Sequence, residues 1–324
     1  MSTPTAEQQL ASPPANPTHP VLPPAVQRPG HSWEPVAPCT DGCLPRPDEL
    51  PRVPAALVVS RLVGLVSLIL LATLVATVLP LLGARRRARV LRAIFRTVLR
   101  VIGVRLSLRG DDRFDAGPGS GGVLMVGNHL SWLDIMALGA IQPMRMVARH
   151  DTRDWPVLGL LAVRIGTLFV NRSELRTLPT LVGNVAEALR GGSVVGLFPE
   201  GTTWCGAAVG EFHRAGFQAA LDAGVPVRPV AQRMCLPDGT VTTAGCFVGD
   251  ETLLDSLLRV VRLPGLTIEI DVLPLLVPAD GVDRRELARR AQLVIAEATG
   301  VAAPEARRVL RTASAGSELV VAAA

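Results

Sequence analysis

The strongest constraint on the fold is an alternation of short apolar segments with longer amphipathic ones over residues 105–300. Short apolar runs predict strands at 104–108, 122–126, 145–148, 167–170, 193–198, 227–231, 241–247 and 266–273. Apolar residues spaced by three and four predict helices at 133–141, 156–163, 178–190, 215–222, 252–261 and 283–298. Strands and helices in turn predict an α/β fold, with a mostly parallel sheet flanked by helices. In such a sheet the ligand site lies at the carboxyl ends of the strands.

The two ends of the chain differ in composition from this domain. Residues 1–53 hold about half of the 27 prolines and few large apolar residues, which predicts a disordered Pro-rich tail. Because no basic segment leads directly into an apolar core at the start, we do not expect a cleaved signal peptide. The Ala-rich residues 301–324 predict a flexible C-terminal tail.

Residues 54–84 include a stretch of 21 residues without a charge, Leu62–Leu82. As an α-helix this stretch is about 30 Å long, which matches the hydrocarbon core of a bilayer. We therefore predict a membrane anchor helix that spans the bilayer once. The arginines of 85–89 place its C-terminal side in the cytoplasm by the positive-inside rule. The alternative is a monotopic helical hairpin that enters one leaflet, which Arg61 and Gly64 favour slightly.

Residues 85–104 predict a basic amphipathic helix. Its arginines gather near one stripe and its large apolar residues form the opposite stripe, as in helices that lie on an anionic membrane surface. An ordinary solvated helix face is the alternative, but the neighbouring apolar stretch favours the lipid interpretation. The net charge of +5 is modest, so its location matters more than its size, and we expect no nucleic-acid partner.

The cysteines give no indication of a metal site. Cys205, Cys235 and Cys246 are scattered, as in proteins of a reducing compartment. Cys39 and Cys43 lie close together in the Pro-rich tail but lack a second pair at metal-ligand spacing, so we predict no zinc site. They would form a disulfide only if the tail were extracytoplasmic.

A histidine and a carboxylate follow the predicted strand at 122–126. His129 and Asp134 are five residues apart, about 140° off a common face of a regular α-helix. They can meet if His129 lies on the loop before the helix and Asp134 lies in its first turn, where the carboxylate can orient the imidazole as a general base. The alternative is structural: Ser131 as N-cap and Asp134 as the partner in a capping box.

Three further segments place polar groups near strand ends. Phe198–Thr203 follows a strand with a carboxylate, a glycine and two hydroxyls, and the backbone of such a turn can bind an anion. Gly166–Arg172 ends a strand on a guanidinium that can bind a phosphate with two hydrogen bonds. Val225–Val230 is a strand with two prolines. Taken singly, each segment has a structural explanation: a turn, a surface ion pair with Glu174, and a buried strand.

Together the four segments resemble the glycerolipid (lysophospholipid) acyltransferase family over about Arg105 to Arg233. The matching residues are Asn128, His129 and Asp134; Gly166, Phe169 and Arg172; Phe198 to Thr202; and Val227 to Val230. Four motifs in this order at fitting spacing are far more specific than any one alone. The resemblance implies His129 and Asp134 as catalytic residues. It implies that Arg172, Glu200, Gly201 and Thr202 bind the acceptor, and that the supporting residues are Asn128, Ser131, Phe169, Pro199 and Pro229.

The resemblance also implies the reaction. A membrane-bound enzyme would move a fatty acyl group from acyl-CoA or acyl-carrier protein to a lyso-lipid hydroxyl, without a cofactor. The first expectation is conversion of 1-acylglycerol-3-phosphate to phosphatidic acid in phospholipid biosynthesis, on the cytoplasmic side of a bacterial cell membrane. Thr203 stands where the lysophosphatidate enzymes usually have arginine, which favours lyso-ornithine lipid or another lyso-lipid as an alternative acceptor. Alternatives of other kinds are a catalytically silent lipid-binding protein and a transacylase.

Overall fold

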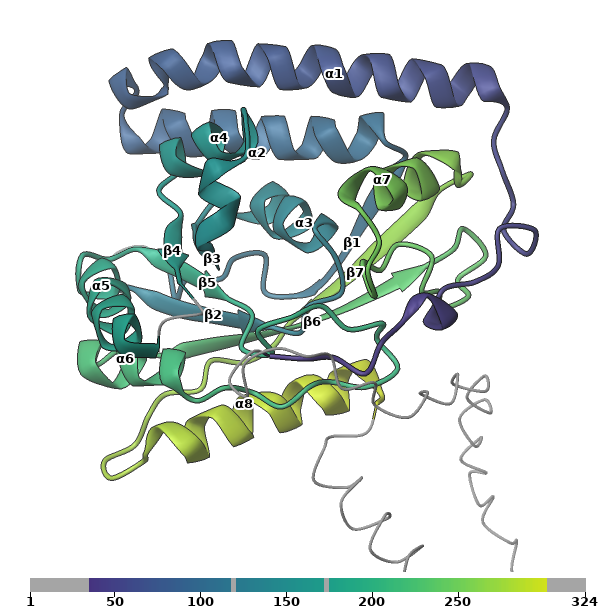
Figure 1. The fold of residues 1–324 in the computed structure, drawn as a ribbon. Helices are drawn as coiled ribbons and strands as arrows, with labels where there is room; N and C mark the ends of the chain where they lie inside the picture. The colour runs from purple at the N-terminus through teal and green to yellow at the C-terminus, as the bar shows by residue number, and fades with distance from the viewer. Residues whose placement is uncertain (1–34, 118–120, 172–174, 302–324) are drawn as a thin grey trace, which may run out of the picture.

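The computed structural model describes residues 35–117, 121–171 and 175–301, and its centre is one sheet in the order β1-β7-β6-β2-β5-β3-β4 (Figure 1). The strands are β1 Val104–Gly110, β2 Val123–Gly127, β3 Arg145–Arg149, β4 Leu168–Val170, β5 Val194–Leu197, β6 Val227–Cys235 and β7 Leu266–Val272. Five neighbouring strands, from β4 to β6, run parallel. Strand β7 is antiparallel to β6 and parallel to β1, so the sheet is mixed.

Helices cover both faces of this sheet (Figure 1). Their bounds are α1 Ala55–Val78, α2 Ala84–Val101, α3 Leu133–Ile141, α4 Leu158–Arg164, α5 Leu178–Arg190, α6 Ala215–Ala223, α7 Leu253–Arg262 and α8 Arg284–Thr299. One core cluster joins α2, α3 and α7 to one face of the sheet, and the other joins α5, α6 and α8 to the opposite face. The α/β architecture predicted from the alternation is confirmed, with the antiparallel β7 as an addition.

The predicted strand at 241–247 is wrong. Within this segment the described backbone forms only an isolated bridge between Val241 and Cys235, followed by turns and bends. The N–H of Phe247 donates to the carbonyl of Leu130 at 2.8 Å instead of to a neighbouring strand. Ala244 and Cys246 are buried against the core, which gave the loop the apolar alternation of a strand.

The prediction of a disordered tail over 1–53 differs from the structure for residues 35–53, which pack on the domain. Cys39 and Cys43 are buried around a short 3-10 turn, Asp41–Cys43. The N–H of Val53 donates to the carbonyl of Arg262 at the end of α7. Residues 1–34 of the tail, and all but the first residue of the predicted C-terminal tail, lie outside the described residues.

Helices α1 and α2 form an antiparallel pair on one side of the domain, joined by a 3-10 turn at Leu79–Leu81 (Figure 1). A Cβ on Gly64 would lie 3.0 Å from Val101, so this glycine permits close approach of the two helices. The buried Arg61 donates from Nη1 to the carbonyls of Val261 and Leu263, both at 2.7 Å. These contacts attach α1 to the domain at both α2 and α7.

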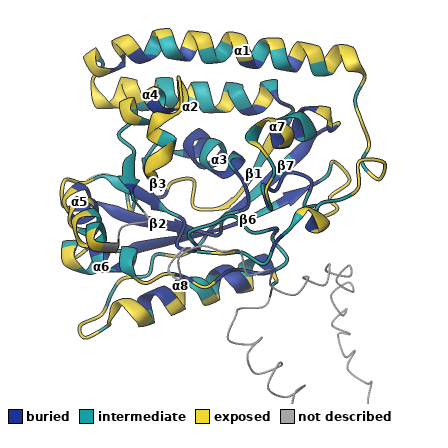
Figure 2. Cartoon of the chain, viewed as in Figure 1, coloured by how far each residue is buried: buried dark blue, intermediate teal, exposed yellow. Residues whose placement is uncertain are grey.

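The two long faces of α1 are both apolar. Its inner face buries Leu65, Ala72 and Ala76, whereas Val63 and Leu70 are exposed on the outer face (Figure 2). Among the described residues, only the helical segment Ala55–Leu81 is long and apolar enough to cross a membrane.

We expect Arg61→Ala to lower the free energy of unfolding by about 2–3 kcal/mol, because two buried carbonyls lose a charged donor. The measurement is chemical denaturation of the full chain in detergent micelles. The exposed Arg85 on α2 provides the control, and Arg85→Ala should change stability by less than about 0.5 kcal/mol. Equal stability of the two variants would show that Arg61 does not anchor α1.

Candidate active site

The histidine loop begins where the sheet core ends. Strand β2 is buried along its whole length, and Asn128 and His129 follow it directly. Its neighbours β5 and β6 run parallel to it, so the segments that follow β5 and the end of β6 lie beside the loop. The sequence prediction that both the histidine and Glu200 lie at this edge of the sheet is confirmed.

Asp134 organises this loop from the first turn of α3. Its Oδ2 contacts Nδ1 of His129 at 2.8 Å and accepts hydrogen bonds from the N–H groups of Leu130 at 2.6 Å and Ser131 at 2.9 Å. The carboxylate is 0% exposed. The predicted side-chain N-cap at Ser131 is absent: α3 begins after Trp132 without a side-chain cap, and Ser131 contributes its backbone N–H.

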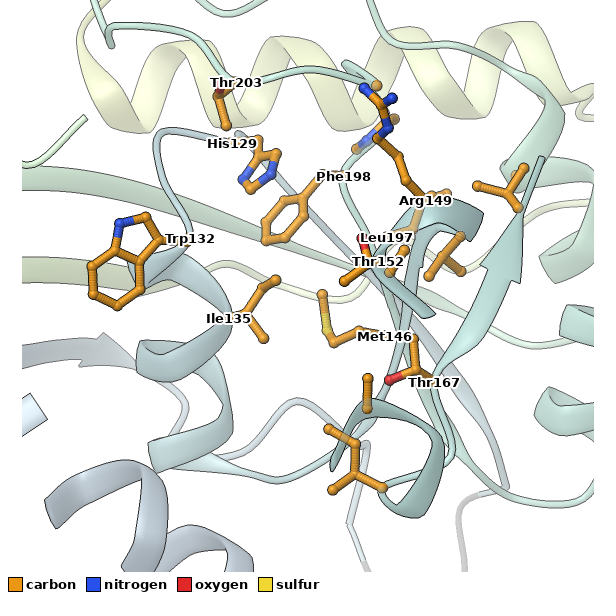
Figure 3. A pocket seen from close by; sticks show the side chains of 18 of the residues that line it. His129, Trp132, Ile135, Met146, Arg149, Thr152, Thr167, Leu197, Phe198 and Thr203 are labelled. Atoms are coloured by element: carbon orange, nitrogen blue, oxygen red, sulfur yellow. The ribbon is translucent and has the colours of Figure 1, made fainter. Parts of the chain in front are cut away.

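This contact assigns the imidazole nitrogens different roles. Because Asp134 faces Nδ1, a neutral His129 donates from Nδ1 and keeps Nε2 as a proton acceptor. The ring stacks on Phe198 with centroids 4.0 Å apart and 3° between the planes (Figure 3). The side chain is 18% exposed and lines a large cavity, so a substrate can reach it.

Glu200, which the resemblance assigns to acceptor binding, supports the loop from the other side. It is 3% exposed, and its two carboxyl oxygens accept from the N–H groups of His129 and Gly210, both at 2.6 Å. Burial raises the pKa of Glu200 to about 8, and the nearby Asp134 adds to this shift. With these two backbone hydrogen bonds, Glu200 holds the histidine loop in this structure.

Asn128 and Gln232 form a pair of side chains that connects the loop to β6. Gln232 donates from its backbone N–H to Oδ1 of Asn128 at 2.8 Å and from Nε2 to the carbonyl of Asn128 at 2.9 Å. Nδ2 of Asn128 donates to the carbonyl of Gln232 at 3.0 Å. The supporting role predicted for Asn128 has a structural basis in these bonds, whereas no motif in the sequence pointed to Gln232.

Two other loops complete the support of the histidine loop. The N–H of Trp204 donates to the carbonyl of His129 at 2.7 Å, and the hydroxyl of Thr203 donates to the carbonyl of Phe247. The N–H of Phe247 donates to the carbonyl of Leu130 at 2.8 Å. The histidine loop is thereby held by backbone hydrogen bonds from both Trp204 and Phe247.

The cavity beside His129 has a volume of about 1560 Å³. Its apolar lining comes from α1, α2, α3 and α4 and includes Leu65, Ile69, Ala72, Phe95, Trp132, Ile135 and Leu161. Figure 3 shows Trp132 and Ile135 near His129. The lining also includes five arginines and three acidic residues: Arg149, Arg164, Arg214, Arg285, Arg289, Glu211, Asp283 and Glu286.

Some of the remaining predicted residues line this cavity and others do not. Gly201 and Thr202 line it, as expected for acceptor-binding residues. Phe169 is half-buried on β4, and Pro229 is buried on β6 opposite Val126 of β2. Arg172 lies outside the described residues.

Comparisons with known proteins agree on one family. The family model described as Acyltransferase matches residues 105–233. The lyso-ornithine lipid O-acyltransferase of Pseudomonas aeruginosa is 39% identical over 187 residues, which cover 57% of this chain and 71% of that protein. The 1-acyl-sn-glycerol-3-phosphate acyltransferase of Neisseria gonorrhoeae is 37% identical over 166 residues, covering 51% of this chain and 65% of that protein.

A solved structure shares the fold. The crystal structure of the 1-acyl-sn-glycerophosphate acyltransferase PlsC from Thermotoga maritima matches with a TM-score of 0.54 at 17% identity, over 74% of this chain and 96% of that one. The fold, the motifs and the relatives together identify the protein as an acyltransferase. The chain belongs to the glycerolipid acyltransferase family, as the four motifs predicted.

We expect Glu200→Gln to lower kcat about tenfold with little change in the KM for the acceptor lipid. An amide has one acceptor oxygen, so one of the two buried N–H groups loses its partner and the histidine loop loosens, at a cost of about 1–3 kcal/mol. Initial rates over a range of acceptor concentrations separate the two parameters. Glu187→Gln, on the exposed face of α5, is the matched control. A raised KM at constant kcat would instead show that Glu200 contributes to acceptor binding.

Proposed function

We propose that this protein transfers a fatty acyl group from an acyl thioester, acyl-CoA or acyl-carrier protein, to the hydroxyl of a lyso-lipid. One observation carries the proposal: the imidazole of His129, oriented by the buried Asp134, lines a large cavity whose wall holds many apolar side chains and five arginines. A silent lipid-binding protein has no use for a buried carboxylate aimed at the inner nitrogen of an accessible histidine.

The chemistry follows from the two nitrogens. Nε2 of His129 takes the proton of the acceptor hydroxyl as its oxygen attacks the thioester carbonyl, and Asp134 stabilises the imidazolium that forms. The tetrahedral intermediate collapses with cleavage of the C–S bond, and the imidazolium returns its proton to the leaving thiolate. The products are an ester and a free thiol. This sequence needs neither an acyl-enzyme nor a cofactor.

The shape of the cavity supports a substrate with a long apolar chain. The apolar lining comes from side chains of α1, α2, α3 and α4, and α1 also carries an exposed apolar face. Acyl chains that contact this lining would leave the ester or thioester end beside His129. The arginines of the lining outnumber its acidic residues five to three, which favours an anionic group such as a phosphate.

We further propose that α1 and α2 bind the membrane as a hairpin in one leaflet, the alternative that Arg61 and Gly64 favoured. Helix α2 packs on α3 of the domain, where a Cβ on Gly139 would lie only 2.5 Å from Phe95. A spanning α1 that kept its contact with α2 would carry the arginines of α2 into hydrocarbon, at about 2.5–3.5 kcal/mol each by insertion scales. An α1 that lies in the leaflet leaves them at the interface.

The acceptor we propose first is 1-acylglycerol-3-phosphate, in phospholipid biosynthesis on the cytoplasmic side of a bacterial membrane. The five arginines of the cavity lining support this acceptor. Arg172 is a further residue that the family resemblance assigns to acceptor binding. Lyso-ornithine lipid is the second candidate. Thr203 in place of the usual arginine and the similarity to the Pseudomonas aeruginosa protein favour it.

We expect His129→Ala to lower turnover at least about 10²-fold, the scale of a lost general base. The assay is thiol release from acyl-CoA in the presence of a lyso-lipid, with the purified full chain in detergent. His150→Ala, in an exposed 3-10 turn, is the control and should retain normal turnover. Near-normal turnover of the His129 variant would remove the mechanism.

An acceptor panel tests the headgroup. With labelled acyl-CoA as donor, 1-acylglycerol-3-phosphate should give a higher kcat/KM than lyso-ornithine lipid or lysophosphatidylcholine, because only it offers a phosphomonoester to the arginines. Preference for lyso-ornithine lipid would select the second candidate. Acyl transfer between phospholipids without any thioester would identify a transacylase.

A further inference from the structure

Three thiols that are far apart in the sequence meet beside the active site. Cys39, Cys43 and Cys205 are all buried, and their Sγ atoms all lie within 4.8 Å of one another. The acyl transfer proposed above uses none of them. A cluster of three converging thiols in a protein interior therefore needs its own explanation.

The fold builds this cluster from two segments. In the N-terminal segment 35–53, which we call the strap, Cys39 precedes the short turn Asp41–Cys43 and Cys43 is its last residue. Cys205 lies in the loop that follows the Phe-Pro-Glu-Gly turn, and its N–H donates to Sγ of Cys39 at 3.2 Å. The hydroxyl of Thr243 donates to the carbonyl of Cys43 at 2.7 Å and fixes the far end of the turn.

We propose that Cys39, Cys43 and Cys205 bind one zinc ion. Zinc takes thiolate ligands at about 2.3 Å in a tetrahedron, so sulfur ligands of a single ion lie about 3.8 Å apart. The separations in the cluster need only small side-chain rotations to reach this value. Binding releases the three thiol protons to solvent and involves no change of oxidation state. From the sequence we predicted no zinc site, because Cys39 and Cys43 lack a second pair of ligands nearby. The fold supplies Cys205 as the third ligand.

Three thiolates leave the fourth position of the tetrahedron to a water molecule. Cys246 is buried nearby, with its Sγ 3.5 Å from the carbonyl of Cys205, but this sulfur is not among those that lie within 4.8 Å of one another. The three thiolates form the core of the site, and the N–H of Cys205 already donates to Sγ of Cys39.

A disulfide explains the geometry less well. It would join two of the three thiols and leave the third buried against the bond, whereas a metal ion uses all three. The cytoplasmic location proposed above also favours a metal ion, because structural disulfides are rare there. All five cysteines, which lie within the described residues, are unpaired in this structure.

The position of the cluster gives the ion a structural role near the chemistry. Trp204, the neighbour of Cys205, donates its N–H to the carbonyl of His129 at 2.7 Å. At the other end of the strap, Pro35 packs against Gly201, where a Cβ would lie 2.6 Å from it. A zinc ion would thus connect the strap, which has little secondary structure of its own, to the loop that supports the catalytic histidine.

The test measures metal in the full chain, purified without an affinity tag that binds metal. We expect about one zinc ion per chain by elemental analysis. Replacement by Co²⁺ should give the absorption bands of tetrahedral cobalt with thiolate ligands. The double variant Cys39→Ser, Cys43→Ser should lose the ion, and the control Cys235→Ser, a buried cysteine at the end of β6, should keep it. These readouts do not depend on acyltransferase activity.

Measurements on the unmodified chain keep the proposal falsifiable even if the double variant fails to fold. Chains that contain no zinc, take up no Co²⁺ and show freely reacting thiols would overturn it. An intact mass lower by two hydrogens without reductant would also overturn it, because the thiols would then form a disulfide. Equal zinc content in the double variant and the wild type would show that the ion lies elsewhere.

Discussion

The structure of the active site depends on one oxygen atom, Oδ2 of Asp134. It contacts Nδ1 of His129 and accepts hydrogen bonds from two backbone N–H groups of the intervening loop, all within 2.9 Å. A buried carboxylate is costly unless several donors satisfy it, and here the donors are the loop itself. Asp134 therefore both holds the backbone before α3 and orients the imidazole, whereas Ser131 forms no side-chain cap. Of the capping box considered from the sequence, only the bond from the N–H of Ser131 to Asp134 is present.

The sheet makes this interaction possible because β2 ends between two parallel neighbours. The carboxyl end of β5 delivers Phe198 to the ring of His129 and Glu200 to its backbone N–H. The end of β6 delivers Gln232 to Asn128. Each neighbour thus supports the residue at the end of β2 from its own side, with hydrogen bonds of 2.6–3.0 Å that leave Nε2 of His129 facing the cavity.

Local patterns predicted most of the fold, and contacts between distant segments account for what they missed. Helices α3 and α5 begin and end at the predicted residues, because Gly, Pro and polar residues mark their ends. The strand predicted at 241–247 is wrong because a loop that packs on the core can have the same apolar pattern as a strand. The roles of Glu200 and Cys205 depend on partners that no local spacing reveals: backbone N–H groups 71 and 10 residues away for the first, and a thiol 166 residues away for the second.

The apolar stretch around Leu62–Leu82 shows how one pattern can arise from two environments. A helix that is apolar all round is expected to be surrounded by lipid or by protein core. In α1 the outer face, with Val63 and Leu70, is exposed, whereas Leu65 and Ala72 on the inner face line the cavity beside His129. If the outer face enters a leaflet, a single helix separates lipid from the apolar part of the cavity. Both faces then meet hydrocarbon, bilayer chains outside and substrate chains inside, which explains why α1 has no polar stripe although it packs on the sheet domain.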